Sequence, residues 1–313
     1  MSRKLNDDFK KALAPENGIL KELLCWVKKD STLDLQFRGS YIDIYYRGGR
    51  ILHLEQSQRQ KSEYTASIDP NYLKEENKEQ IELPSSIKSE NDLKIWLDNF
   101  PYIKQKRDFH YSEEKNTAER EFVQMIVRSN NYERTSGSTD FYITDMEYDL
   151  AGDGKIDLLG FQVIKNSKDK IDAQFAFIEV KFGNSSVKGE SGLVKHLSDI
   201  ENFVIRDGEY FKNLKKDTQE VFRQKVSLGL TSFDSNVEKE ISFEEGTNPL
   251  FIIVLADYKR RANNLKNIIS EINEMNYPNL NIKFALGSFM GYGMYSDCLY
   301  SKSEVLNLLK RDR

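Results

Sequence analysis

The sequence predicts an α/β protein in which a mixed β-sheet is flanked by helices and is preceded by a smaller α+β unit. Two observations predict this class. After residue 116, segments with helical periodicity alternate with strand-like segments, an order typical of a layered α/β core. Before residue 101, three short alternating strands are separated by Gly39-Ser40 and Gly48-Gly49, which are turn signals of a β-meander. We therefore expect an N-terminal α+β domain over residues 1–105 and a larger domain over residues 106–313.

The N-terminal domain is expected to begin with a helix over residues 13–28, followed by the strands LDLQFR, YIDIYYR and RILHLEQ. Residues 56–90 are polar and contain few large apolar side chains, so this stretch is interpreted as a loop. Ser89 and Asp92 resemble a capping box, which predicts a short helix that ends before Pro101. The charged stretch 102–116 lacks periodicity, and we place the domain boundary there.

The elements of the larger domain are predicted from the spacing of their apolar residues. Helices are expected over residues 117–129, 192–205, 210–228, 260–275 and 303–311. Strands are expected over residues 141–148, 156–164, 173–182, 249–257 and 280–289. This order of elements predicts an α/β layer pattern with a mixed sheet.

Composition and charge exclude several classes of protein. A hydrophobic content of 39% excludes global disorder, and the longest wholly apolar run, residues 250–256, is too short to span a bilayer. The N-terminal residues lack the apolar segment of a secretory signal, so we expect a cytoplasmic protein with no membrane partner. Two cysteines exclude a disulfide framework, and three dispersed histidines make carboxylates the expected ligands of any metal, which favours Mg²⁺. A net charge of −4 excludes a wholly basic nucleic-acid binder but not a local basic face.

Charged residues interrupt two adjacent strands that otherwise favour burial. In the strand FAFIEVKFG, apolar residues lie on both faces, so we expect an interior strand from which Glu179 and Lys181 project. Asp157 interrupts the preceding strand, and a hairpin turn centred near residues 167–168 would bring it beside Glu179 to within one step of register. Cross-strand neighbours have Cβ atoms about 5 Å apart. Buried charges are costly unless they are paired or bind a metal. A divalent cation between the two carboxylates would relieve their repulsion.

Three segments resemble, in this order, the motif of the PD-(D/E)XK nuclease superfamily. They are the helix start Thr117-Ala118-Glu119-Arg120-Glu121-Phe122 and the strand segments Gly154-Lys155-Ile156-Asp157 and Ile178-Glu179-Val180-Lys181. Together they look like archaeal Holliday junction resolvases and related restriction-type nucleases. The resemblance covers residues 115–205 and implies a restriction-endonuclease-like mixed β-sheet core.

This resemblance implies a metal-dependent endonuclease that hydrolyses phosphodiester bonds of nucleic acid and leaves a 5′-phosphate. It favours DNA as the substrate and leaves RNA as the alternative. Asp157, Glu179 and the Val180 carbonyl would hold Mg²⁺ or Mn²⁺, and Glu119 would complete the site directly or through water. Lys181 would position the attacking water or neutralise charge in the transition state. The predicted catalytic residues are therefore Glu119, Asp157, Glu179 and Lys181. The family also implies a role in bacterial restriction, anti-phage defence or repair.

Two helices leave alternatives open. If Asn116 is the N-cap of its helix, Glu119 falls at position N3, where a carboxylate stabilises the helix start without any catalytic role. Glu121 competes with Glu119 as the ligand from this helix. On the helix after the Glu179 strand, Lys195 or His196 would assist near the phosphate, or both belong to a solvated helix face.

Other interpretations compete with catalysis. Asp157, Glu179 and Lys181 could form a surface ion-pair ladder on an edge strand, and the chain could be an inactive nucleic-acid- or protein-binding module or a structural subunit. Under each of these interpretations, the N-terminal domain is expected to select a substrate, a partner protein or a second copy in a homodimer. The basic clusters at 212–216 and 258–261 are candidate contacts to the nucleic-acid backbone, and a solvated face is the alternative for each. The aromatic turn at 45–47 is a candidate for stacking on bases, and packing of the N-terminal core is its alternative.

Overall fold

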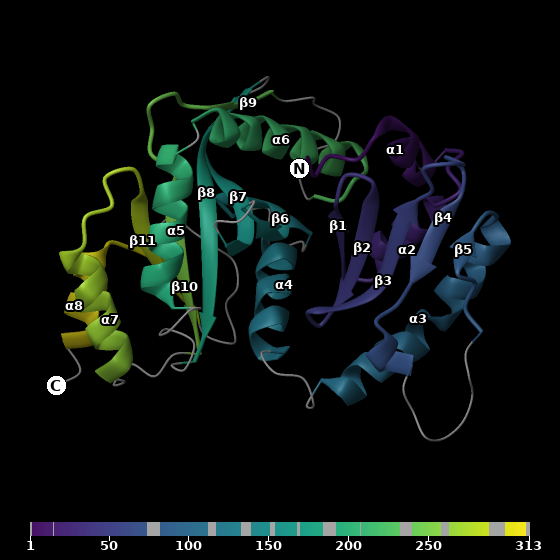
Figure 1. Ribbon diagram of the computed structural model, residues 1–313, viewed down its shortest axis with the longest axis horizontal. Helices are drawn as coiled ribbons and strands as arrows, with labels where there is room; N and C mark the ends of the chain where they lie inside the picture. The colour runs from purple at the N-terminus through teal and green to yellow at the C-terminus, as the bar shows by residue number, and fades with distance from the viewer. Residues whose placement is uncertain are drawn as a thin grey trace. The chain divides into compact units, whose positions relative to one another are not determined.

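The computed structural model describes residues 2–14, 16–73, 82–111, 117–132, 139–150, 154–167, 170–183, 192–206, 208–231, 240–257, 263–287 and 298–310 (Figure 1). Contacts between residues divide the chain into two compact units. The first unit comprises Met1–Gln124 and Glu220–Ser235, and the second comprises Met125–Gln219 and Asn236–Arg313. The division therefore falls after Gln124 rather than after residue 105, and a later segment returns to the first unit.

The first unit is built on a five-stranded antiparallel sheet in the order β1-β2-β3-β4-β5. Its strands are β1 Leu33–Phe37, β2 Tyr41–Tyr46, β3 Gly49–Gln56, β4 Tyr64–Ser67 and β5 Ser86–Ile87. The predicted meander is confirmed as β1, β2 and β3. The expected loop over residues 56–90 is wrong in part, because it contains β4, β5 and a 3-10 helix at Pro70–Leu73. Strands of 4 and 2 residues are too short to produce a readable alternation.

The helices of the first unit correct two predictions. The helix expected over residues 13–28 is in fact α1 Asp7–Leu13 and α2 Lys21–Lys29. The chain turns sharply between them, where a Cβ on Gly18 would lie 2.1 Å from the carbonyl oxygen of Ala12. The capping box at Ser89 and Asp92 is confirmed, but the helix that it begins, α3 Glu90–His110, continues through Pro101.

Packing explains why α3 tolerates a proline. Its buried apolar residues follow the helical spacing on both sides of Pro101: Leu93, Trp96, Leu97, Phe100 and Ile103. Proline in a helix interior removes one hydrogen bond and crowds the preceding turn, at a cost of about 3 kcal/mol. Burial of large apolar side chains contributes about 1.5–3 kcal/mol each, so the buried stripe offsets that cost.

The second unit is built on a mixed sheet in the order β12-β11-β10-β8-β7-β6, with β9 paired to β8. Its strands are β6 Phe141–Asp149, β7 Lys155–Asn166, β8 Lys170–Phe182, β9 Glu240–Phe243, β10 Leu250–Ala256, β11 Asn281–Gly287 and β12 Leu299–Tyr300. The hairpins β6–β7 and β7–β8 are antiparallel, whereas β8, β10 and β11 run parallel. All five predicted strands are confirmed. The mixed α/β class is confirmed with them.

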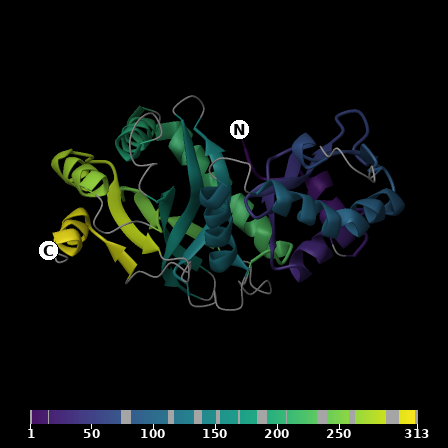
Figure 2. The same cartoon turned by 90° about the horizontal axis from the view of Figure 1, so that it is seen from below.

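Helices α5, α6 and α7 contribute to one hydrophobic core with β8 and β10. The helices of this part of the chain are α4 Thr117–Asn131, α5 Leu193–Arg206, α6 Gly208–Ser227, α7 Asn263–Glu274 and α8 Lys302–Lys310. Aromatic rings form the centre of the core, where Phe175 and Phe177 of β8 meet Phe203 of α5 and Phe211 of α6. Both ribbon views place α5 and α7 on the same side of this sheet (Figures 1 and 2). Among the described helices, none combines the length and the apolar character needed to cross a bilayer.

Candidate active site at the ends of β7 and β8

The predicted pairing of Asp157 with Glu179 agrees with the observed register. The last pair of the β7–β8 ladder is Leu158 with Ile178, and the same register places Asp157 beside Glu179. Both strands continue beyond this pair, but the ladder does not. Beyond this pair, the Asp157 side chain replaces a backbone acceptor, and its Oδ2 accepts a 2.8 Å hydrogen bond from the backbone N–H of Val180. Since the N–H and C=O of a strand residue point to the same side, the Val180 carbonyl also faces β7.

Glu179 and Lys181 form a buried ion pair on the interior strand β8. The Lys181 Nζ lies 2.6 Å from Glu179 Oε1, and the two residues are 3% and 2% exposed. Strand β8 has β7 on one side and β10 on the other. The alternative of a surface ladder on an edge strand is therefore wrong. The carboxylates avoid the expected repulsion because each has its own partner, a backbone amide for Asp157 and an ammonium for Glu179.

A histidine from α5 completes the charged cluster. His196 Nε2 lies 3.3 Å from the same oxygen of Glu179, and the ring is mostly buried. Lys195, by contrast, points to solvent and pairs with Asp199 at 2.7 Å on the helix surface. The structure thus separates the two candidates: Lys195 belongs to the solvated face, and His196 faces the sheet.

The burial of His196 against the sheet was predictable from the helical spacing, although the apolar residues of the helix did not by themselves indicate it. A core-facing helix stripe follows the spacing i, i+3, i+4 and i+7. Counted from Leu193, these positions are His196, Leu197 and Ile200. A polar residue inside such a stripe faces the core, so this spacing alone could have placed His196 against the sheet.

Glu119 and Glu121 both lie in the first two turns of α4, within the first unit. Glu121 is held by Arg47, whose Nε lies 2.9 Å from Oε1, and Arg47 also pairs with Asp108 at 2.8 Å. Burial and a hydrogen bond from Tyr111 to Glu121 raise the pKa of the Tyr111 phenol to about 12. Glu121 is therefore engaged in a structural network, while Glu119 is half-buried. The N-cap proposed at residue 116 lies outside the described residues.

The donor set at the end of β7 and β8 fits a hard divalent cation, although it is small. Among the described residues, no three His, Cys, Asp or Glu side chains gather into a metal-binding group. Mg²⁺ does not require such a group, because it keeps several waters and binds through one or two carboxylates with substrate phosphates. Asp157, Glu179 and the Val180 carbonyl supply two carboxylates and one neutral oxygen. These are the oxygen ligands that Mg²⁺ and Mn²⁺ prefer.

The structure describes part of the basic clusters and the aromatic turn that the sequence offered as nucleic-acid contacts. In the cluster 212–216, Lys212 and Lys216 are exposed, and Lys215 is half-buried with its Nζ 4.5 Å from the centre of the Phe211 ring. Burial lowers the pKa of Lys215. The cluster 258–261 lies outside the described residues. In the aromatic turn, Tyr45 is buried and Tyr46 is half-buried, so core packing explains only part of it.

Comparisons with protein-family models, with curated proteins and with solved structures found no match. What the chain does is therefore inferred from the geometry of this cluster and from the resemblance of its motifs.

Proposed function

We propose that this chain is a divalent-metal-dependent nuclease that hydrolyses phosphodiester bonds in DNA, with a restriction-endonuclease-like core in its second unit. One observation carries the proposal. Asp157, Glu179 and Lys181 lie together where two adjacent strands diverge, and the last two are buried on an interior strand. Buried charges are costly, and clusters of them are more frequent at functional sites than in structural cores. The resemblance of the three sequence motifs supports the same chemistry.

Each residue has a distinct proposed role. Asp157 and Glu179, with the Val180 carbonyl, would hold Mg²⁺ or Mn²⁺, and Glu119 remains the proposed further ligand. A bound cation of this kind lowers the pKa of water and stabilises charge on a phosphate. Lys181 would place a positive charge near the scissile phosphate, since an ammonium acts as a compact point charge. His196 would position Glu179 through its Nε2 contact.

The cellular setting belongs to the same proposal. A cytoplasmic enzyme of bacterial restriction, anti-phage defence or repair is what the motif resemblance suggests. The first unit would select the substrate, a partner protein or a second copy of the chain. These assignments depend on nuclease activity and are tested only after it.

A cleavage screen tests the activity directly. Linear, nicked, branched and single-stranded DNA, with RNA as a comparison, would be incubated with Mg²⁺, with Mn²⁺ and with chelator. We expect cleavage that requires a cation. Lys181→Met keeps the aliphatic part of the side chain and removes the charge. It should lower the single-turnover rate by about 10²-fold or more, the size of effect that follows removal of a stabilising electrostatic group from an active site. Its DNA affinity at fixed salt should change by less than about tenfold, because one phosphate contact among several is removed.

Lys195→Met is the matched control, because Lys195 is on the next helix but points to solvent. It should cleave at the wild-type rate. Equal rates for wild type and Lys181→Met, with both proteins folded by circular dichroism, would show that the role assigned to Lys181 is wrong.

Calorimetry tests the cation site independently of activity. Asp157→Asn keeps an oxygen that can accept the hydrogen bond from Val180 but removes the charge. It should weaken Mn²⁺ binding and abolish cleavage. Identical Mn²⁺ binding by wild type and variant would place the cation elsewhere.

One observation favours an inactive binding module instead. Lys181 already neutralises Glu179, and His196 lies against the same oxygen, so Glu179 has a counter-charge without a divalent cation. A module of this kind predicts no cleavage of any substrate and nucleic-acid binding that chelator leaves unchanged.

A further inference from the structure

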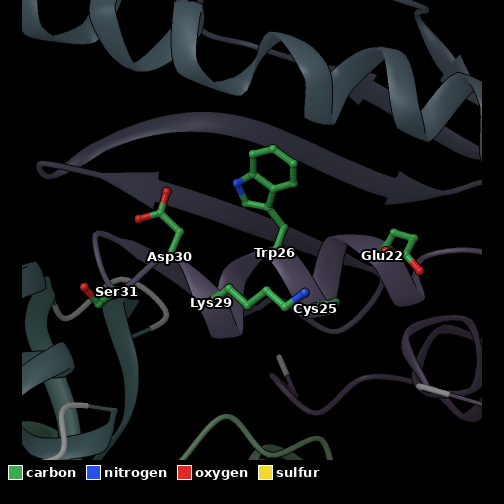
Figure 3. Close-up of a pocket in the computed structure, with 6 residues that line it drawn as sticks. All are labelled: Glu22, Cys25, Trp26, Lys29, Asp30 and Ser31. Atoms are coloured by element: carbon green, nitrogen blue, oxygen red, sulfur yellow. The ribbon is translucent and has the colours of Figure 1, made fainter.

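A groove on the first unit follows the exposed edge of α2. One depression of about 500 Å³ is lined by Glu22, Cys25, Trp26, Lys29, Asp30 and Ser31 (Figure 3). A second, of about 310 Å³, shares Trp26 and Asp30 with the first and continues past Tyr46 to Lys104 of α3. We call the two together the Trp26 groove. Both volumes fall in the range of small-ligand sites, about 300–1,000 Å³.

Trp26 is anchored on the core and still reaches the groove. Its ring lies edge-to-face against Phe100, with centroids 6.0 Å apart, and Phe100 is fully buried. Trp26 itself is only partly buried. The other tryptophan of the chain, Trp96, is 1% exposed and donates its indole N–H to the Pro84 carbonyl. The first unit therefore holds one tryptophan for its core and presents the other on its surface.

The charges along the groove largely cancel. Lys104 pairs with Asp30 at 2.8 Å, and its Nζ lies 4.7 Å from the centre of the Tyr46 ring. Of the other charged lining residues in the first depression, Glu22 is negative and Lys29 is positive. The second depression adds Asp108, whose Oδ1 lies 2.8 Å from Nη1 of Arg47. A balanced groove with aromatic walls favours a neutral group inside it and leaves charged groups, such as the phosphates of a strand, in the solvent outside. It fits a flat, neutral aromatic group that stacks on Trp26.

We propose that the Trp26 groove binds an unpaired base of a nucleic-acid strand by stacking on the Trp26 indole. The proposal rests on the proposed function, because it assumes that the ligand is nucleic acid. Base–aromatic stacking is tolerant of sequence, since every base has a π-face. The groove would thus direct the enzyme to substrates with unpaired nucleotides, and it gives the first unit a specific role.

Intrinsic fluorescence tests the groove, because the chain has only 2 tryptophans. Oligothymidylate would be added in chelator, so that no cleavage occurs. The fluorescence of wild type and of Trp96→Phe, which retains Trp26, should be quenched. Trp26→Phe, which retains only the buried Trp96, should show no quenching. Equal quenching of the two single variants, or none in wild type, would overturn the proposal.

Affinity provides the second measurement, from the anisotropy of labelled oligothymidylate in the same buffer. Trp26→Leu keeps an apolar side chain but cannot stack, and should bind roughly 5- to 160-fold more weakly. Trp26→Tyr retains an aromatic face and should stay within about threefold of wild type, although the smaller ring fills the site less well. A duplex of the same strand should bind all variants alike. Equal loss in Trp26→Leu and Trp26→Tyr would indicate a structural role and overturn the proposal.

Adding thymidine monophosphate in place of oligothymidylate distinguishes a site for a base within a strand from a site for a free nucleotide. Binding of a base within a strand predicts weak quenching by the mononucleotide, whereas equal affinity for both would identify a nucleotide site and overturn the assignment to a strand. Failure of this proposal differs from failure of the nuclease proposal. Cation-dependent cleavage without quenching overturns the groove alone, and quenching without cleavage on any substrate overturns the nuclease alone.

Discussion

Replacing Lys181 with methionine should reveal how the buried cluster is balanced. Lys181 lies 2.6 Å from Glu179 Oε1, and both side chains are almost inaccessible to water. Removing one partner of a buried ion pair costs about 3–5 kcal/mol, because the remaining charge keeps its desolvation penalty and loses its attraction. His196 Nε2 stays 3.3 Å from the same oxygen and can supply part of the lost interaction. We therefore expect a loss near the lower end, about 3 kcal/mol in the free energy of unfolding.

A divalent cation should restore much of this loss. If Asp157 and Glu179 hold Mn²⁺, the cation supplies the counter-charge that Lys181 no longer provides. A ligand present at a hundred times its Kd stabilises the folded state by about 2.7 kcal/mol. Because Glu179 loses its ammonium partner in the variant, Mn²⁺ should stabilise Lys181→Met more than wild type, by about 1 kcal/mol or more. This result would hold even for a protein without nuclease activity.

Urea denaturation, followed by circular dichroism in chelator and in Mn²⁺, measures both effects. Lys195→Met is the control, because it breaks the Lys195–Asp199 pair, in which the lysine is 50% exposed. Exposed pairs contribute about 0–1 kcal/mol, so this variant should resemble wild type in both buffers. If Lys181→Met is as stable as wild type in chelator, the pair is not balanced as described. If Mn²⁺ stabilises the two proteins equally, Glu179 is not a cation ligand.

Two further predictions concern the fold itself. A Cβ on Gly160 would lie 2.2 Å from the carbonyl oxygen of Tyr142, so Gly160→Ala should cost about 1–3 kcal/mol, whereas Gly208→Ala, with nothing within 4 Å, should change stability by less than about 0.5 kcal/mol. Thermal denaturation of both variants checks this difference, and equal stabilities would contradict it. Burial raises the pKa of Asp30, but its hydrogen bonds, led by that from Lys104, outweigh burial and hold the pKa below 3.8. Because the folded-state pKa is depressed, this stabilisation is present above pH 3.8 and is lost as the pH falls through the folded pKa, so Asp30→Asn should flatten the acid limb of a stability–pH curve.

Local sequence signals predicted the second unit better than the first. The strands of the second unit are mostly long, and β10 is a continuous apolar run that is buried throughout. In the first unit, the boundaries depend on contacts that no local signal reveals. Nothing in the sequence distinguishes Gly18 from other glycines, but in the structure the carbonyl of Ala12 leaves no room for a side chain at this position. Pro101 suggests a helix end in the sequence, but α3 continues through it with buried apolar residues on both sides. Tertiary packing overrides propensity at both positions.

The proximity of Asp157, Glu179 and Lys181 was predictable from the sequence, but the pairing of their charges was not. Apolar flanks alone indicated that Glu179 and Lys181 lie on an interior strand, and burial of both residues confirms this. The sequence suggested that the two carboxylates would repel each other and that a cation between them would relieve the repulsion. The structure instead gives each a partner, since the Val180 amide caps Asp157 and Lys181 neutralises Glu179. The partners of the two carboxylates depend on where the β7–β8 ladder ends. The spacing of apolar residues in the sequence does not indicate that position.

A single extra residue in β7 decides which face Asp157 occupies. Near the turn, Asn166 pairs with Ile171, which centres the hairpin one residue later than the sequence suggested. Continued without interruption, that register would set Asp157 opposite Val180 and turn its side chain to the other face of the sheet, away from Glu179. The ladder shifts by one residue between Val163 and Lys165, however, and beyond this β-bulge Asp157 falls beside Glu179. Bulges of this kind re-aim side chains next to functional sites. The bulge therefore brings the two carboxylates to one face, and a slip of the turn by one residue would separate them.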